Sequence, residues 1–240
     1  MTETVWNGYR RIDFTFEGRD AILVFPKSAN ANKSWLFKTE YFEAFPTLEV
    51  EMLKRGWHLA FIKNVTRWCI DEDLDLKFRF AKYLSLEYGL APRCVPVGMS
   101  CGGMFAVKLA AKYPEIISAL YLDAPVMNLL SCPCSLGVGK SNFFEEFYAA
   151  TKISMSELIS YREHPIDKMH VLLENDVPIV LVYGDSDDIV PFSENGALLL
   201  DYYNKRGGKI LAIGKEGCGH HPHGLPDSTE IANFLEKMGK

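Results

Sequence analysis

Short apolar runs alternate with segments of helical spacing along most of this 240-residue chain. The runs DAILVFP (20–26), VPIVLVYG (177–184) and KILAIGK (209–215) lack the strict polar alternation of a half-exposed strand. Each therefore fits a strand that is buried on both faces. The intervening segments, among them PTLEVEMLKRG and CGGMFAVKLAAKYP, begin and end with residues typical of helix termini. This alternation predicts a mainly parallel sheet flanked by helices.

Two parts of the chain depart from the alternation. Before residue 20, YRRIDFTFEGRD predicts one antiparallel edge strand and a turn. Residues 128–175 carry helical patterns and no strand pattern, which predicts a small helical lid, or cap, inserted after the sixth strand. No linker or repeat divides the remainder, so we expect residues 1–240 to form a single domain with 128–175 as its lid.

Composition excludes several classes of function. The chain is 48% hydrophobic and 24% charged, as in ordinary globular domains, and its formal net charge of -5 argues against a nucleic-acid partner. We expect no membrane partner, because no apolar run reaches the roughly 18 residues of a spanning helix. The start of the chain lacks a signal-peptide pattern. The six cysteines match no zinc-ligand spacing, and we interpret them as reduced thiols of a cytoplasmic protein.

The stretch VPVGMSCGG contains a serine, Ser100, in a G-x-S-x-G pattern between an expected strand and an expected helix. A sharp strand-to-helix turn leaves little room for side chains two residues before and after its centre, so glycine suits both positions. Such a turn presents the Ser100 hydroxyl as a nucleophile, and the N–H of Cys101 at the helix start would stabilise an oxyanion. Because the glycines are centred on Ser100, we assign the nucleophile to this serine and not to Cys101.

A serine nucleophile needs a general base, and three histidines follow the last expected strand in EGCGHHPHGL. We favour His220, the first of them, with His221 and His223 as alternatives. The other interpretation of this cluster is a metal site or a polar loop.

The base in turn needs an acid that orients it. Asp187 is favoured, because the pattern G-x-x-D-x-x-V-P places it just beyond an expected strand. Asp185 is interpreted as a turn residue. Asp123, at the end of another strand, is the alternative acid.

The elbow GMSCGG, the acid loop YGDSDDIVP and the histidine loop GHHPHGL, in this order, make the chain resemble the α/β-hydrolase superfamily over nearly all of its length. The segments WLFKTEYFEAF (35–45) and HHPH (220–223) also resemble a bacterial branch of esterase-like proteins. The resemblance implies the α/β-hydrolase fold and a serine esterase. Members of that branch often carry arginine at the position of Cys101, so we expect this pocket to lack that charge.

Further site residues are expected around the triad. The loop after AILVFP should provide the second oxyanion donor, a backbone N–H of Lys27 or Ser28. Trp35, Glu40 and Met99 are expected to bind substrate near the mouth of the site. For Trp35 and Glu40 the alternative is structural, an anchoring aromatic residue and a helix-start acid.

These residues together predict a carboxylic ester hydrolase that uses Ser100, His220 and Asp187 through an acyl-enzyme. Its substrate would be a small-molecule ester, for example an acylated sugar, and no cofactor or metal is expected. One alternative is an amide or peptide hydrolase with the same triad. Another is a non-catalytic ligand-binding protein on this fold.

Overall fold

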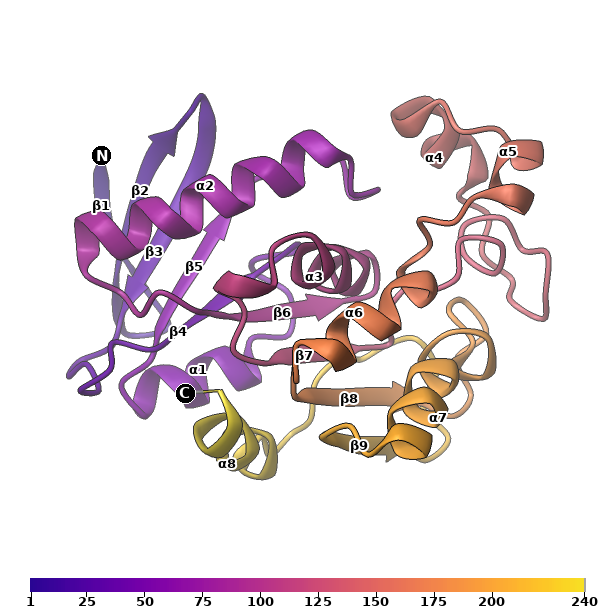
Figure 1. Ribbon diagram of the computed structural model, residues 1–240. Coiled ribbons are helices and arrows are strands. Elements are labelled where there is room, and N and C mark those ends of the chain that lie inside the picture. Colours follow the sequence, from indigo (N-terminus) through magenta and orange to yellow (C-terminus); the bar gives the residue numbers. More distant parts are fainter. Residues whose placement is uncertain (240) are drawn as a thin grey trace.

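The computed structural model describes residues 1–239, which form one nine-stranded sheet with helices on both faces (Figure 1). The strands are β1 (Thr2–Trp6), β2 (Tyr9–Phe16), β3 (Arg19–Phe25), β4 (Trp35–Lys38), β5 (His58–Ile62), β6 (Val95–Met99), β7 (Leu120–Asp123), β8 (Ile179–Gly184) and β9 (Ile210–Lys215). The α-helices are α1 (Thr47–Lys54), α2 (Asp71–Tyr88), α3 (Cys101–Lys112), α4 (Phe144–Thr151), α5 (Met155–Ser160), α6 (Met169–Glu174), α7 (Gly196–Arg206) and α8 (Thr229–Met238).

The strand order is β1-β2-β3-β5-β4-β6-β7-β8-β9, and the six strands from β5 to β9 along this order are parallel. This confirms the prediction of an α/β-hydrolase fold with a mainly parallel sheet. The carboxyl ends of β4, β6, β7 and β8 consequently meet at one edge of the sheet. Strand β3 runs antiparallel to β5, so its carboxyl end lies at the opposite edge.

The strand pattern differs from the expectation in two respects. The residues before 20 form two strands, β1 and β2, in place of one edge strand and a turn. The additional strand β4 has only four residues, too few for a pattern to be recognised in the sequence. The helical segment therefore follows the seventh strand, β7, and not the sixth.

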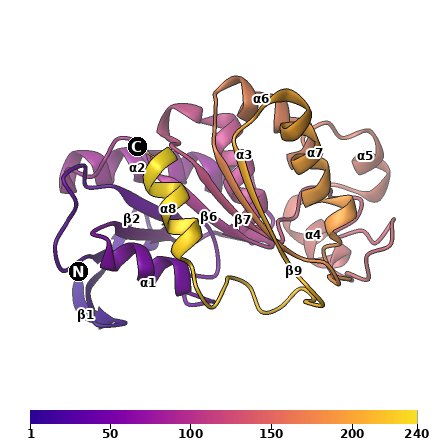
Figure 2. The ribbon, with the colours of Figure 1, turned by 90° about the horizontal axis from the view of Figure 1, so that it is seen from below.

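Two groups of buried side chains cover the two faces of the sheet. Helices α2, α3, α6 and α7 pack on one face, with Phe80 and Phe105 among their buried residues. Helices α1 and α8 lie side by side on the other face and bury Met52 and Leu235 (Figure 2). None of the helices within residues 1–239 combines the length and apolar character needed to cross a lipid bilayer.

Residues 124–178 contain helices and turns and no strand, and α4 and α5 stand beyond the carboxyl ends of β6, β7 and β8 (Figure 1). This segment is joined to the core by buried side chains, because Phe147 packs edge-on against Trp68 at 5.5 Å between ring centroids. Its helices therefore lie next to the sheet edge that carries the loops after β6, β7 and β8.

Candidate active site

Ser100 occupies the sharp turn between β6 and α3. Its φ of 52° and ψ of -119° fall in a region that residues with a side chain rarely adopt. Backbone hydrogen bonds hold this conformation: the N–H of Ser100 donates to the carbonyl of Asp123, and the N–H of Val126 donates to the carbonyl of Ser100, both at 3.0 Å. A turn of this kind directs the serine side chain above the carboxyl edge of the sheet.

The glycines around Ser100 are required to different degrees. A Cβ atom on Gly98 would lie 2.7 Å from the carbonyl carbon of Gly102, and one on Gly103 would lie 2.7 Å from the Cα of Pro125. A Cβ on Gly102 would come no closer than 3.1 Å to its neighbours. The tight positions are therefore Gly98 and Gly103, whereas the pattern in the sequence had emphasised Gly98 and Gly102.

The structure brings Ser100, His220 and Asp187 together in one chain of hydrogen bonds. Nε2 of His220 lies 3.0 Å from Oγ of Ser100, and Nδ1 of His220 lies 2.7 Å from Oδ2 of Asp187. An ionised carboxylate only accepts hydrogen bonds, so Nδ1 donates to Asp187 and Nε2 presents its lone pair to the Ser100 hydroxyl. This is the arrangement in which histidine can take a proton from serine.

Asp187 is held in place from both sides. Its Oδ1 accepts hydrogen bonds from the N–H groups of Ile189 and Val190, each at 2.9 Å. Burial opposes ionisation of this carboxyl group, but the hydrogen bonds from His220 and Val190 outweigh burial and keep the pKa of Asp187 below its usual value. Asp187 is therefore charged at neutral pH, as an orienting acid must be.

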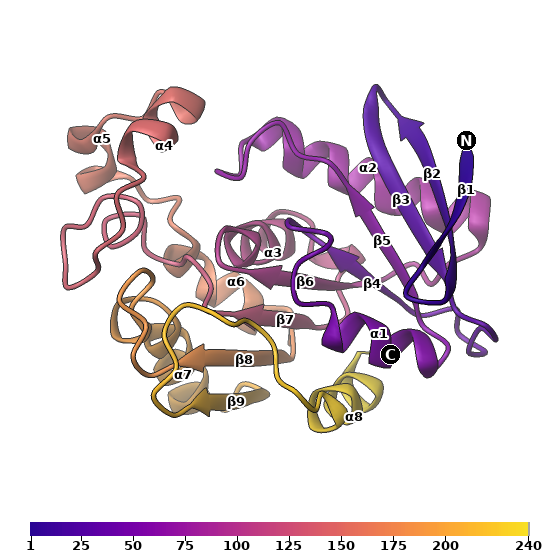
Figure 3. The ribbon, with the colours of Figure 1, turned by 180° about the vertical axis from the view of Figure 1, so that it is seen from behind.

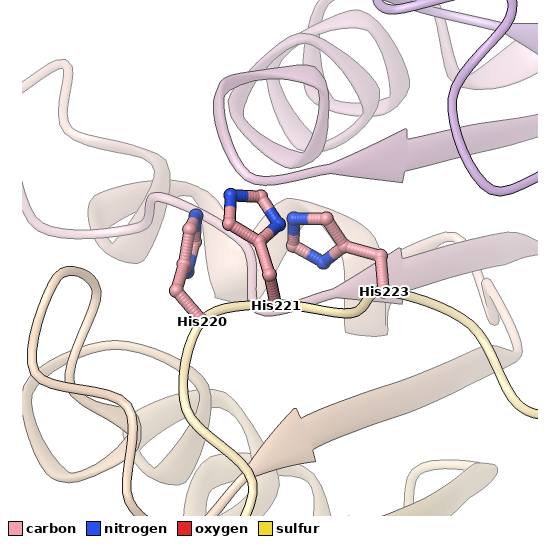
Figure 4. A group of neighbouring side chains, drawn as sticks. All are labelled: His220, His221 and His223. Carbon is pink, nitrogen blue, oxygen red and sulfur yellow. The ribbon is translucent and has the colours of Figure 1, made fainter.

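The other two histidines lie in the same loop, residues 216–228, which we call the histidine loop (Figure 4). It passes the carboxyl ends of β8 and β7 before it reaches α8 (Figure 3). Nδ1 of His223 lies 3.1 Å from Oδ1 of Asp123, so the alternative acid is paired with His223 and not with His220. His221 is exposed and stacks on Phe45 with 5.8 Å between ring centroids.

Asp185, also in the acid loop, has the turn role expected for it. Oδ1 of Asp185 accepts hydrogen bonds from the hydroxyl of Ser186 at 3.0 Å and from the N–H of Gly217 at 2.8 Å. Asp185 thus joins the loop after β8 to the histidine loop.

Cys101 is the first residue of α3, where N–H groups have no intrahelical partner, so its N–H is available to an oxyanion beside Ser100. Its thiol is buried, and burial raises the pKa of Cys101 to about 11. A thiol that stays protonated is a poor nucleophile, which agrees with the assignment of Ser100.

The prediction of Lys27 and Ser28 as oxyanion donors is wrong. Both follow β3, whose antiparallel direction carries them to the edge of the sheet opposite Ser100. A Cβ on Gly56, just before β5, would lie 2.7 Å from the carbonyl oxygen of Ser28, which locates this loop at the start of β5. The strand that ends beside Ser100 is β4, which the sequence had not revealed.

The loop after β4 brings Tyr41 into the site. Tyr41 lines the same cavity as Ser100 and Cys101, and its side chain interacts with the Cys101 thiol and the Arg67 guanidinium. Burial raises the pKa of Tyr41 far above its usual value, so its hydroxyl keeps its proton.

Of the three residues expected to bind substrate, the structure places one on the cavity wall and two in structural positions. Trp35 is only 1% exposed at the start of β4, and its indole N–H donates to the carbonyl of Ala91 at 2.9 Å, so it is an anchor far from the site. Glu40 accepts hydrogen bonds from the Asn64 amide and from the N–H of Tyr41, which is a structural role. Met99 does line the cavity.

A cavity of about 470 Å³ opens beside the Ser100 hydroxyl. Its walls are mainly apolar. The residues on these walls that the sequence does not predict are Tyr41, Ala44, Phe45, Arg67, Cys132, Phe143, Ile189 and Val190. Ile189 and Val190 come two and three positions after Asp187, and Tyr41 to Phe45 lie in the segment WLFKTEYFEAF. Closeness to a strand end is therefore the sequence signal for these residues.

Position 101 carries no charge, as expected, but another part of the chain places a positive charge in the pocket, because Arg67 lies on its wall. Nε of Arg67 donates to Oε1 of Glu146 at 2.8 Å, and a second nitrogen bonds Oε2 of the same carboxylate. The guanidinium also lies 4.7 Å from the ring centroid of Phe143. Arg67 thus joins the core to α4 at the margin of the cavity.

Comparisons with known proteins identify the family. The sequence model of the prolyl oligopeptidase family (Peptidase_S9) matches residues 55–238. The acylamino-acid-releasing enzyme of Mus musculus is 26% identical over 132 residues, which are 54% of this chain and 17% of that protein. The chain thus matches only a small part of this relative.

Solved structures show the same fold. The dipeptidyl peptidase 4 of Porphyromonas gingivalis superposes with a TM-score of 0.72 at 14% identity, over 98% of this chain and 36% of the other. The acylaminoacyl peptidase of Pyrococcus horikoshii gives a TM-score of 0.70 at 13% identity, over 97% and 42%. With the family match, these findings show that the chain belongs to the prolyl oligopeptidase family of serine hydrolases, within the α/β-hydrolase superfamily.

Proposed function

We propose that this chain is a serine peptidase that cleaves the amide bonds of short, N-terminally blocked peptides. The observation that carries the proposal is the hydrogen-bonded series Asp187–His220–Ser100 at the wall of the cavity. Membership of a peptidase family supports amide hydrolysis over the ester hydrolysis that sequence analysis had placed first.

In the proposed reaction, Ser100 Oγ attacks the acyl carbon while Nε2 of His220 takes its proton. The same nitrogen then delivers that proton to the leaving amine, which an amide needs more than an ester does. Asp187 holds the imidazole and stabilises its charged form. Water repeats the sequence on the acyl-enzyme and releases the acid.

Two donors are proposed for the oxyanion. The N–H of Cys101 is the first, because it opens α3 next to the nucleophile. The hydroxyl of Tyr41 is the second, since it lines the cavity with Ser100 and stays protonated. Each donor of this kind contributes about 2.7–4 kcal/mol to transition-state stabilisation.

The cavity wall supports a blocked N-terminus. None of the wall residues within the described part of the chain, 1–239, is acidic, and the carboxylate of Glu146 at the margin is already paired with Arg67. A free ammonium group would find no carboxylate partner there and would be buried unpaired. An acylated amine is neutral and suits the apolar wall of Phe45, Phe143 and Ile189.

A matched set of substrates tests the proposal. The set shares the phenylalanine side chain and consists of the N-acetylated p-nitroanilide, the N-acetylated p-nitrophenyl ester and the p-nitroanilide with a free amino group. The Ser100→Ala variant provides the blank. We expect Ser100-dependent cleavage of the blocked anilide, with kcat/KM at least about 10-fold above that of the unblocked one. Cleavage of the ester alone would leave the esterase of the sequence analysis as the function. No cleavage, with no labelling of Ser100 by a fluorophosphonate, would indicate a binding protein.

We further propose that residues 128–175 act as a lid. The support is the position of α4 and α5 beyond the strand ends and the pairing of Glu146 on α4 with Arg67 on the cavity wall.

A further inference from the structure

The histidine loop gathers three imidazoles at the edge of the cavity. The ring centroids of His220, His221 and His223 lie 4.9 Å apart in each pair. One nitrogen of each ring lies within 4.8 Å of the other two, and the rings are directed toward one another (Figure 4). Such convergence from one short loop exceeds what a single catalytic base requires.

Two of the three imidazole rings are oriented in the same way, by a hydrogen bond from Nδ1 to a carboxylate. Nδ1 of His220 is bonded to Asp187 and Nδ1 of His223 is bonded to Asp123, at 2.7 and 3.1 Å. A histidine that donates Nδ1–H to a carboxylate keeps Nε2 unprotonated and fixed in orientation. This carboxylate–histidine pairing is the usual support of a zinc ligand.

We propose that His220, His221 and His223 bind a divalent transition-metal ion, Zn²⁺ in particular, and that the bound ion stops hydrolysis. Three neutral imidazoles with an open fourth position form a zinc-type site, and a water molecule or Oγ of Ser100 can take the fourth position. The ion occupies the lone pair of His220 Nε2, so this nitrogen no longer accepts the Ser100 proton. The inhibitory part rests on the proposed function, whereas metal binding does not.

The geometry requires one modest movement. Zinc–nitrogen bonds are about 2.0–2.1 Å long, so ligand nitrogens around a tetrahedral ion are roughly 3.4 Å apart. The present nitrogens, within 4.8 Å, must close in by roughly 1.4 Å. His221 is exposed and can move most easily, whereas His220 and His223 are held by Asp187 and Asp123 and approach each other through a small shift of the histidine loop.

Calorimetric titration of Zn²⁺ into chelator-treated protein at pH 7.5 tests binding without any turnover. We expect one site with Kd below about 1 μM, and at least about 100-fold weaker binding by His221→Gln, which loses a direct ligand. His170→Gln, on the exposed surface of α6, is the matched control and should bind like the wild type. Cys218→Ser should also bind normally, which excludes the loop thiol as the ligand.

Ser100→Ala separates this inference from the proposed function, because it should still bind Zn²⁺ although it cannot hydrolyse. In the active protein, micromolar Zn²⁺ should abolish hydrolysis and a chelator should restore it. Each variant is compared with its own metal-free rate, and His221→Gln should need at least about 10-fold more Zn²⁺ for half inhibition. Equal zinc affinity, or equal zinc inhibition, in the wild type and His221→Gln would overturn the site.

Discussion

His223 and Asp123 form a second histidine–carboxylate pair beside the triad, 3.1 Å apart and both buried. Asp123, at the end of β7, also accepts hydrogen bonds from the N–H of Gly224 and the hydroxyl of Tyr121. These contacts tie the histidine loop to the strand that neighbours β6. The distance between His220 and Ser100 therefore depends on an anchor outside the triad.

Replacement of His223 by glutamine should loosen this anchor. We expect kcat to fall by about 10- to 100-fold, because a displacement of about 1 Å of a catalytic group has effects of this size, while KM changes much less. Steady-state kinetics with the blocked anilide measure both constants. Asp185→Asn, which alters another contact of the same loop, is the control with a smaller effect on kcat. A native kcat in folded His223→Gln would show that the anchor is dispensable.

Asp187→Asn tests the orienting acid. An asparagine amide can donate to Nδ1 and so favours the wrong tautomer of His220, and kcat should drop by about 10⁴-fold. Circular dichroism should show a folded protein. If Asp123→Asn lowered kcat as severely as Asp187→Asn, the assignment of Asp187 as the acid that orients His220 would be contradicted.

The two glycines after Ser100 should respond differently to alanine. Gly103→Ala forces a Cβ against Pro125 and should lower the free energy of unfolding by about 1–3 kcal/mol, as overpacked sites do. Gly102→Ala meets its neighbours at 3.1 Å or more and should be tolerated with a smaller loss. Urea unfolding of both variants gives the comparison, and equal losses would contradict the structure.

Protonation of His58 in the unfolded chain should lower the free energy of unfolding in mild acid, relative to neutral pH. Burial lowers the pKa of His58 from 6.5 to about 4, and its Nδ1 has no hydrogen-bond partner within residues 1–239. Between these two pKa values the unfolded chain binds the additional proton, so stability falls as pH decreases from 6.5 to about 4. The loss from this group is at most about 3 kcal/mol.

Urea unfolding at pH 7 and pH 4.5 measures this effect. His58→Gln should lose less stability than the wild type between the two pH values, and His170→Gln should behave like the wild type. The same pH dependence in all three proteins would exclude His58 as the source.

Glu146→Gln should release the lid. The Arg67–Glu146 pair is partly exposed, with 30% and 51% of the two side chains accessible, so global stability should change by less than about 1 kcal/mol. We expect faster proteolytic cleavage within residues 128–175 and an altered KM, because α4 loses its ion pair with Arg67 and keeps the packing of Phe147 on Trp68. Glu145→Gln, its neighbour on α4, is the matched control. Equal proteolysis of both variants would argue against a tethered lid.

The triad was predictable because each member follows an apolar strand of five or six residues, long enough for its pattern to be recognised. Ser100, Asp187 and His220 all lie just beyond β6, β8 and β9, and parallel strands end at a common edge. The glycines of the elbow identified the nucleophile, and the cluster of histidines limited the general base to three candidates.

The loop after β4 and the pocket could not be predicted from the sequence, and the reason is physical. Strand β4 has four residues, and its place between β5 and β6 reverses the chain order of β4 and β5. No local pattern encodes such a crossover. Without β4, the loop after β3 is the natural candidate for the oxyanion donor, so the sequence points to Lys27 and Ser28 in place of Tyr41, for which we propose that role. It also assigns Trp35 to the wrong edge of the sheet. Arg67 was overlooked because a lone arginine after a strand has no signature.

The three triad residues lie far apart in the sequence: His220 comes 120 positions after Ser100 and 33 positions after Asp187. The Ser100 hydroxyl has this proton acceptor only when β9 and the histidine loop behind it are docked. Under the proposed function, the appearance of turnover in a refolding experiment would report that the loops after β6, β8 and β9 have come together.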